Sequence, residues 1–311
     1  MTDRAITKRP VARRQSLFAR LRSRLSRRPA ERGQAPGPAV AAPAAVIRPV
    51  GPPPDALTVR QWLYGPGFII PGDADYVLEL VEPFHLDPSM TMLDMACGLG
   101  GAARTISREF KTYVTGFDRD ADLARRGTEI SLAQGFARHN QLSAYDPETF
   151  ELRTGFYDHA ISREATYSVA QKERFLRVLN QAMKPMGQLV LTDFVRGEEA
   201  GEQPELEAWA ATQRYKPQLW TAAQYADCFK SLGFDLRIAT DVTAEYRRTI
   251  LLAWKNFLER GELRHLRSSQ AGPVIDEVEH SLRTVAALES GALKFYYFVA
   301  LAARRRGPSA G

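Results

Sequence analysis

The sequence is poor in the residues that build disulfide-stapled or metal-dependent sites. Its 311 residues include two cysteines, Cys97 and Cys228, and five scattered histidines, with no CxxC or HExxH pattern. Two cysteines are too few for a disulfide framework, which favours a reducing, cytoplasmic setting. Without clustered cysteine and histidine ligands, we expect no bound metal.

Long hydrophobic runs are also missing. No stretch reaches the roughly 18 apolar residues of a membrane-spanning helix, and no apolar segment follows the N-terminal charges as a secretory signal requires. Acids are scarce near the N-terminus: residues 1–32 hold 11 of the 42 Lys and Arg against Asp3 and Glu31, a local net charge of +9. The remainder carries 31 basic and 34 acidic residues, or −3.

The N-terminal residues divide into a basic tail, 1–28, and a linker, 29–55. In the tail, Leu17, Phe18, Leu21 and Leu25 share one helical face among arginines. This pattern suits peripheral binding to an anionic membrane surface or to a protein complex, resembles a transit peptide, or marks a disordered, solubilising tail. The linker is rich in proline and alanine and lacks the apolar side chains that a folded core requires.

From residue 56 to about 306 the chain alternates strand and helix patterns. This alternation predicts one α/β domain with a Rossmann-like, doubly wound parallel sheet. Strands are expected at 91–96, 112–118, 157–162 and 187–195, and helices at 100–110, 119–136 and 171–183. Two further β-rich stretches, 234–242 and 293–304, are separated by long helical patterns such as 244–261.

The stretch LDMACGLGG, residues 93–101, forms a glycine-rich turn after the first of these strands. Ligands of open parallel sheets bind beyond the carboxyl ends of the strands, and Asp118 ends the next strand. Gly98 and Gly100 also fit the dinucleotide fingerprint, but an acid just ahead of them, Asp94, would repel a pyrophosphate at the helix N-terminus. An acid there favours a ligand with a cationic group and no phosphate, such as S-adenosylmethionine.

Four ordered motifs resemble those of class I S-adenosylmethionine-dependent methyltransferases. LDMACGLGG is similar to their first motif, with Ala96 where a glycine is commoner, and VTGFD, residues 114–118, to their second. YDHAISREA, residues 157–165, resembles the fourth, and MKPMGQLVLTDF the strand motif in which Met186 replaces a glycine. The resemblance covers about residues 63–302. It implies a seven-stranded sheet with an antiparallel last strand.

The same resemblance implies where the cofactor binds. Asp118 would hold the ribose, Gly98 and Gly100 would follow the methionine part, and Asp146 would lie near the adenine amino group. The full set of expected cofactor-binding residues is Asp94, Ala96, Gly98, Gly100, Asp118, Asp146 and Ser162.

Within this class the chain resembles phosphoethanolamine and related small-molecule N-methyltransferases, through residues 64–73, 162–172 and 211–234. It departs from them at the acceptor site. Ser168 stands where that family places a catalytic histidine, its partner tyrosine has no counterpart, and its phosphate-binding basic residue falls on apolar residues around Val299. The resemblance therefore implies the scaffold and leaves the phosphobase substrate open.

The residues after the fourth strand are the expected site of methyl transfer. Glu164, Tyr167 and Ser168 are the candidate catalytic residues. Glu164 suits binding of a cation or action as a weak base, or is simply an acid favoured by a helix N-terminus. The candidate acceptor-binding residues are Tyr64, Phe68, Arg163, Arg214 and Tyr215; core packing is the alternative for Tyr64, Phe68 and Trp62.

These observations predict a methyltransferase that acts on nitrogen or oxygen of a small molecule, such as an amine, a lipid headgroup or a ring hydroxyl. The alternative is a methyltransferase-like, non-catalytic subunit that its basic tail tethers to a membrane or complex. A nucleic-acid substrate is disfavoured because the body is acidic and lacks the Asn/Asp-Pro-Pro-aromatic and Pro-Cys motifs. A dehydrogenase is disfavoured by Asp94.

Overall fold

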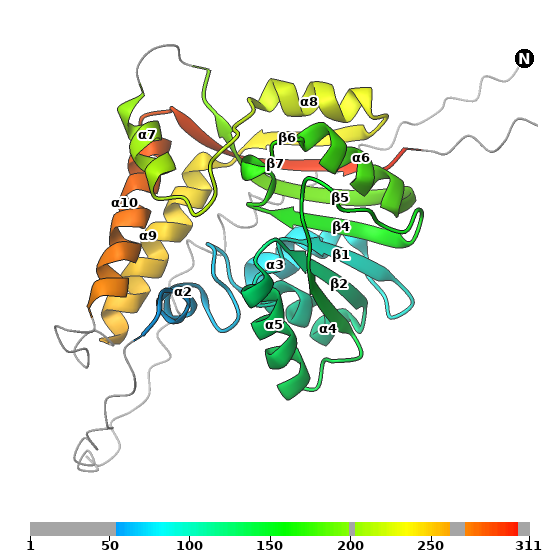
Figure 1. The fold of residues 1–311 in the computed structure, drawn as a ribbon, viewed down its shortest axis with the longest axis horizontal. Coiled ribbons are helices and arrows are strands. Elements are labelled where there is room, and N and C mark those ends of the chain that lie inside the picture. Colours follow the sequence, from blue (N-terminus) through cyan, green and yellow to red (C-terminus); the bar gives the residue numbers. More distant parts are fainter. Residues whose placement is uncertain (1–53, 199–202, 262–270, 304–311) are drawn as a thin grey trace, which may run out of the picture. The chain divides into compact units, whose positions relative to one another are not determined.

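A single mixed sheet organises the structure, a computed structural model that describes residues 54–198, 203–261 and 271–303. Its seven strands have the order β3-β2-β1-β4-β5-β7-β6, and β7 alone among them runs antiparallel to its neighbours (Figure 1). The strands are β1 Thr91–Met95, β2 Tyr113–Asp118, β3 Asn140–Ala144, β4 Tyr157–Arg163, β5 Met183–Arg196, β6 Asp235–Asp241 and β7 Leu293–Leu301. The predicted fold class is confirmed.

Helices connect and extend this sheet. They are α2 Ala56–Tyr64, α3 Ala74–Val81, α4 Gly101–Phe110, α5 Ala121–Ala133, α6 Lys172–Ala182, α7 Pro204–Ala211, α8 Ala222–Ser231, α9 Thr243–Arg260 and α10 Gly272–Glu289, with short 3₁₀ turns at Glu82–Phe84 and Thr166–Ser168. The predicted strands and helices are all present. Strand β3 was not located from sequence because Leu142 is its only large apolar residue, and only Asn140 and Leu142 of its five residues are buried.

A dense apolar core fixes the sheet under the strand ends. Phe175 and Leu179 of α6 and Phe229 of α8 pack against sheet residues such as Leu191 and Phe298, and all five side chains are fully buried. Burial of each such side chain stabilises the fold by about 1.5–3 kcal/mol. The loops at the strand ends therefore rest on a rigid base.

Four helices, α2, α7, α9 and α10, form a second group beside one end of the strands (Figure 1). Trp62 of α2 stacks on Phe257 of α9 with 6.0 Å between ring centroids. The Trp254 Nε1 group of α9 donates a hydrogen bond of 2.9 Å to Ser281 Oγ of α10. Aromatic and polar contacts thus join helices that are far apart in sequence.

Helix α10 buries polar residues alongside apolar ones. Its buried residues include Glu277, Ser281 and Thr284, whereas Ile275 and Leu282 are more than half exposed. A surface helix ordinarily buries its apolar face. The polar side of α10 therefore faces the interior of the protein, where its groups need hydrogen-bonding partners.

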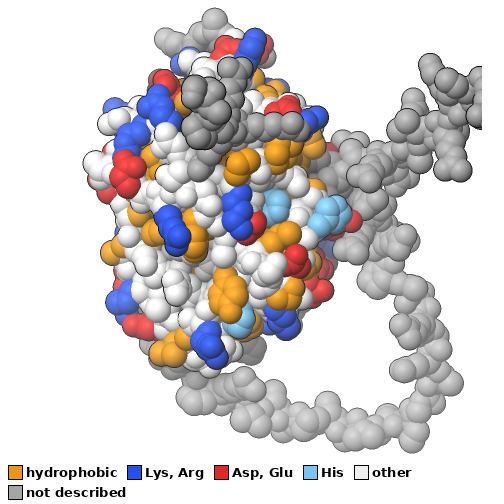
Figure 2. All heavy atoms as spheres, turned by 90° about the vertical axis from the view of Figure 1, so that its right-hand side faces the viewer, with side chains coloured by type: hydrophobic (Ala, Val, Ile, Leu, Met, Phe, Trp, Pro, Cys, Tyr) orange, Lys and Arg blue, Asp and Glu red, His pale blue; other side chains and the backbone are white. Residues whose placement is uncertain are grey.

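The predicted tail, residues 1–28, lies outside the described residues, as does the linker apart from its last two residues. Within the described ranges, no helix has both the length and the apolar character needed to cross a bilayer. The face that lies to the right in Figure 1 shows charges of both signs among scattered hydrophobic side chains (Figure 2).

Candidate functional site

A cavity of about 520 Å³ opens at the carboxyl ends of the parallel strands. One side is formed by the loops that follow β1, β2, β3 and β4. The other is formed by α2, the segment after α7, α9 and α10. This is the edge of an open α/β sheet at which ligands bind, so we treat the two sides as a cofactor half and an acceptor half.

Asp94 in β1 is an unpaired carboxylate in the wall of the cavity. It is 2% exposed, and its Oδ2 atom has no hydrogen-bond partner. Burial raises the pKa of Asp94 to about 7, despite the opposing effect of Arg163. A buried acid without a partner is stabilised by a cationic ligand, as predicted from its place ahead of the glycines.

Asp118 ends β2 and organises the glycine-rich turn. Its Oδ2 accepts the Gly98 N–H at 2.8 Å, and its Oδ1 accepts the Asp120 N–H at 2.9 Å. Burial raises the pKa of Asp118, against the effect of these two hydrogen bonds. The turn also requires left-handed backbone at Ala96, with φ of 71°, which explains why a glycine is commoner there.

These residues fit S-adenosylmethionine. Asp94 offers an unpaired acceptor for the cationic methionine end, and Asp118 places a carboxylate in the same cavity at the end of the neighbouring strand. The backbone at Gly98 has little room for a side chain, since a Cβ atom there would meet the Ile69 side chain at 3.2 Å. Tyr145 and Pro147 line the cavity beyond β3, on the side where the adenine was expected.

Three of the predicted cofactor residues lie off the cavity wall. Gly100 is the N-cap of α4, with φ of 75°. Ser162 is fully buried in β4 with an unpartnered Oγ. Asp146 is exposed, and its carboxylate accepts hydrogen bonds from Glu148 N at 2.9 Å and Thr149 Oγ1 at 2.8 Å, as in a local turn.

Glu164 is the titratable group that the structure sets apart in the acceptor half. It lies outside the helices with a left-handed φ of 52°, so stabilisation by a helix N-terminus does not apply. Its N–H donates to Thr192 O at 2.8 Å, and the Tyr246 hydroxyl bonds its carboxyl group. Burial raises the pKa of Glu164 to about 8, against the effects of Arg163 and Tyr246.

The two other candidate catalytic residues also line the cavity. The Ser168 hydroxyl accepts a hydrogen bond of 3.0 Å from Arg119 Nη1, and the Tyr167 hydroxyl donates to Gln213 Oε1 at 3.2 Å. Tyr167 also packs edge-on against Phe194. Both hydroxyls are thus engaged by neighbouring side chains.

Arg163, Tyr64 and Phe68 all line the cavity. The Arg163 Nη2 group donates to Pro71 O at 2.7 Å, and its guanidinium lies 5.1 Å from the centroid of the Tyr76 ring. Arg163 thereby holds residues 64–73 over the site. Tyr64 and Phe68 are buried, whereas Trp62 stacks within the helical group and is absent from the cavity wall.

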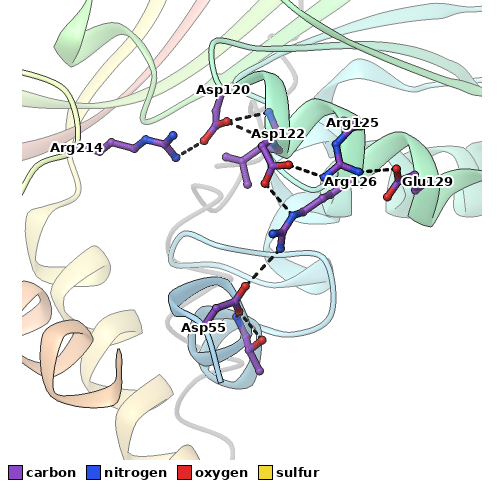
Figure 3. A network of polar contacts seen from close by, with 9 residues as sticks. Asp55, Asp120, Asp122, Arg125, Arg126, Glu129 and Arg214 are labelled. Atoms are coloured by element: carbon purple, nitrogen blue, oxygen red, sulfur yellow. Dashed lines mark hydrogen bonds and ion pairs between the residues drawn. The ribbon is translucent and has the colours of Figure 1, made fainter. Parts of the chain in front are cut away.

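Arg214 and Tyr215 lie on the cofactor side rather than beside Glu164. The Arg214 guanidinium pairs with the Asp120 carboxylate next to Asp118 (Figure 3). The Tyr215 ring lies 3.7 Å from the Arg119 guanidinium. These contacts place the segment after α7 against the end of β2.

A second ion pair links the cofactor half to α2. Arg126 of α5 bonds the Asp55 carboxylate at 3.3 Å, and Asp55 also caps α2 by accepting the Thr58 N–H (Figure 3). Arg126 further pairs with Asp122 at 2.8 Å on its own helix. Charged side chains of α5 and of its N-cap therefore contact both α2 and the segment after α7.

Sequence reasoning missed the polar residues that α2 and α10 contribute. Arg60 Nε donates to Glu277 Oε2 at 2.8 Å, and His280 Nδ1 lies 3.2 Å from Thr212 Oγ1. Ser281, which bonds the Tyr64 hydroxyl, also lines the cavity. The available signal was the polar series at positions 277, 281 and 284 opposite an apolar face.

Comparisons with known proteins agree with this geometry. A family model described as a methyltransferase domain matches residues 70–237, more than half of the chain. Phosphoethanolamine N-methyltransferase 2 of Caenorhabditis elegans is 27% identical over 208 residues, which are 66% of this chain and 46% of that protein. The enzyme of Plasmodium falciparum is 21% identical over 212 residues, 67% of this chain and 77% of that protein.

A solved structure has the same fold. Phosphoethanolamine N-methyltransferase 2 of Haemonchus contortus, in complex with phosphomonomethylethanolamine and S-adenosylhomocysteine, superposes with a TM-score of 0.70 at 19% identity, covering 80% of this chain and 57% of that chain. The present chain spans less than half the length of the Caenorhabditis relative.

Proposed function

The chain belongs to the family of methyltransferase domains, its cofactor is S-adenosylmethionine, and we propose that it transfers the methyl group to the nitrogen of a small amine. The observation that carries the proposal is Glu164, a half-buried carboxyl group in the acceptor half whose pKa is raised to about 8. Oxygen acceptors such as ring hydroxyls are the competing class.

Most of the catalytic demand falls on alignment. When bound, the cofactor supplies an electrophilic methyl group. Asp94 and Asp118 would hold the cofactor in place. Residues 64–73 would cover the site and exclude water. Correct placement of two reactants can account for about 7–11 kcal/mol of a barrier, so strong acid–base groups are not required.

The acceptor must nevertheless lose a proton. An amine with a pKa near 10 is protonated at pH 7, and its nitrogen lone pair is then blocked. Transfer of that proton to an ordinary carboxylate is uphill by about 6 pKa units, or about 8 kcal/mol, whereas transfer to a group with a pKa of about 8 costs about 3 kcal/mol. In the ligand-free protein at pH 7 Glu164 is mostly protonated, and it would release that proton to solvent, at a cost of about 1.4 kcal/mol, on pairing with the ammonium group. The ionised carboxylate would then take the ammonium proton.

The neighbours of Glu164 support this role. The Tyr246 hydroxyl orients the carboxyl group, and the constrained backbone at φ of 52° leaves its side chain in the cavity wall. Ser168, which replaces the histidine of the related enzymes, already accepts the Arg119 N–H. We assign proton handling to Glu164 and a positioning role beside the cofactor to Ser168.

Transfer of a labelled methyl group to a panel of amines and phenols tests the proposal. We expect methylated amines, and a decrease of about 10²-fold in kcat/KM for Glu164→Gln, the low end of the usual contribution of a general base. Binding of the cofactor should be unaffected in this variant. The matched control is Glu129→Gln, an exposed residue of α5 paired with Arg125, which should leave both properties unchanged.

Two outcomes would contradict the proposal. Methylation of phenols with no transfer to amines would move the acceptor to oxygen. Tight cofactor binding with no transfer to any acceptor would instead support a non-catalytic binding subunit, the alternative that the replacement of histidine by Ser168 favours.

A further inference from the structure

The acceptor half contains an ion pair that serves no step of the proposed reaction. The Arg60 Nε group of α2 donates to Glu277 Oε2 of α10 at 2.8 Å. The Glu277 side chain is 4% exposed, that of Arg60 is 30% exposed, and both residues line the cavity. A pair at such depth costs desolvation energy and is weak evidence for stability, so its place in the cavity wall calls for another account.

Apart from Glu164, which interacts electrostatically with Arg60, the surroundings of this pair are polar but uncharged. Burial lowers the pKa of His280 to about 4, with Arg60 as a further cause, so this imidazole is neutral at pH 7. Ser281 and Thr284 add hydroxyl groups from the same face of α10, and Thr212 adds another from the end of α7. With Glu164 left aside for the ammonium group, this part of the wall can donate and accept hydrogen bonds, yet its net charge is zero.

The other arginines of the cavity are engaged elsewhere. Arg163 bonds Pro71 O and lies near Asp94, and Arg214 pairs with Asp120. Arg119 bonds Ser168 and covers the Tyr215 ring. None of these three arginines is therefore placed to offset the charge of Glu277.

Charge balance then distinguishes classes of acceptor. An ammonium group offsets an ionised Glu164, and Arg60 already offsets Glu277. A phosphate at the far end of the acceptor would add two negative charges next to a buried carboxylate, where like charges repel strongly because the local dielectric constant is low. A hydroxyl or amide would instead bond His280, the α10 hydroxyls and the free edge of Arg60.

We propose that the Arg60–Glu277 pair selects amine acceptors whose far end is uncharged and hydrogen-bonding, and excludes those that carry a phosphate. The inference rests on the proposed methylation of amines and names the class of amine. Glu277 is then a specificity-determining residue, because it cancels the one guanidinium that a phosphate would otherwise use.

A matched pair of acceptors tests the inference: N-methylethanolamine and its phosphate ester, phosphomonomethylethanolamine. Each is titrated into the protein saturated with S-adenosylhomocysteine, and each is assayed for methyl transfer from S-adenosylmethionine. We expect the wild type to favour the amino alcohol at least tenfold in both Kd and kcat/KM. In Glu277→Gln, which frees Arg60, the preference should shift toward the phosphate ester at least tenfold.

Variants of Arg60 serve as controls for a general loss of structure in Glu277→Gln. Arg60→Gln leaves Glu277 unpaired and should reject the phosphate ester still more strongly. The double variant Arg60→Gln/Glu277→Gln removes both charges and should keep the preference for the amino alcohol. Thermal unfolding and S-adenosylhomocysteine binding report whether each variant is folded. If Glu277→Gln is not folded, Arg60→Gln decides the matter, because an unchanged preference in that variant overturns the selectivity.

The outcomes separate this inference from the function on which it rests. A wild type that prefers the phosphate ester, or an unchanged preference in folded Glu277→Gln, overturns the selectivity and leaves amine methylation intact. S-adenosylhomocysteine binding without binding or methylation of any amine, in the pair above or in the wider panel, overturns both.

Discussion

The two halves of the cavity are built in different ways. The cofactor half comes from short loops at the ends of β1 and β2, and its main polar groups, Asp94 and Asp118, lie close in sequence to the glycines that they serve. The acceptor half is assembled from side chains of α2, α9 and α10, and its Arg60–Glu277 pair joins residues 217 positions apart in the sequence. The cofactor, which is common to the family, would thus be bound by one compact motif. The acceptor, which differs between members, would be bound by residues that are dispersed in the sequence.

Substitution of Asp118 by alanine should impair cofactor binding more than any other change predicted below. Its carboxylate accepts two buried N–H groups, from Gly98 and Asp120, and each unsatisfied donor costs about 1–3 kcal/mol. We expect the affinity for S-adenosylmethionine to fall at least 100-fold, a loss of about 2.7 kcal/mol, as measured by isothermal titration. Glu129→Ala, at the exposed side of α5, is the control; an Asp118→Ala protein that binds normally would refute the assignment of the cofactor half.

The acceptor half should control how stability depends on pH. Glu164 has a folded-state pKa of about 8, above its ordinary value of about 4.3, so the folded protein binds a proton that the unfolded chain has released. This stabilisation is complete below about pH 4 and is lost as pH rises to 8, by up to about 1.4 kcal/mol per unit.

Denaturant unfolding of the ligand-free protein at pH 5, 6.5 and 8 measures this effect. In Glu164→Gln the slope should be shallower, so that the variant gains stability relative to the wild type as pH rises. Asp94, with a pKa of about 7, contributes a slope of the same sign in both proteins. Parallel curves for the two proteins would show that Glu164 does not hold a proton in the folded state.

Cofactor binding should show a smaller proton linkage through Asp94. Because burial raises the pKa of Asp94 to about 7, pairing with a cation requires release of a proton at lower pH. Between pH 5.5 and 6.5 the affinity should rise by up to tenfold, or about 1.4 kcal/mol. Titration in two buffers with different ionisation enthalpies counts the protons released, and Asp94→Asn should abolish the dependence. A pH-independent affinity in the wild type would contradict the ionic role of Asp94.

The division between the halves also explains what could be predicted. The strand–turn–helix pattern at residues 91–110 and Asp118 were recognisable because a cofactor loop needs particular backbone shapes and charges in a fixed order. Met186 and Ala96 were noted as departures from glycine, and both do adopt the left-handed backbone, with φ of 66° and 71°. The seven-stranded sheet and the antiparallel β7 followed from the resemblance and are confirmed, whereas the strand order comes from the structure alone.

The acceptor half was beyond such reasoning because its contacts depend on how helices pack. Neither Arg60 nor Glu277 stands in a recognisable motif, and a charged residue in a helix is ordinarily solvated. They form an ion pair only because α2 and α10 bring them together in the folded protein. For Arg214, proximity in the sequence to a family motif suggested an acceptor role, whereas its ion pair with Asp120 lies beside the cofactor loop.

The smallest effect is expected where the two halves meet at the surface. The Arg214 side chain is 66% exposed, and an exposed ion pair contributes at most about 1 kcal/mol and is screened by salt. Arg214→Ala should therefore lower cofactor affinity less than fivefold, with no difference from the wild type at 0.5 M salt, in equilibrium titrations. The control is Arg125→Ala, which removes ion pairs on the outer side of α5. If Arg214→Ala instead removes acceptor binding while cofactor affinity is retained, Arg214 contacts the acceptor as its sequence position suggested, and the boundary between the halves shifts toward α7.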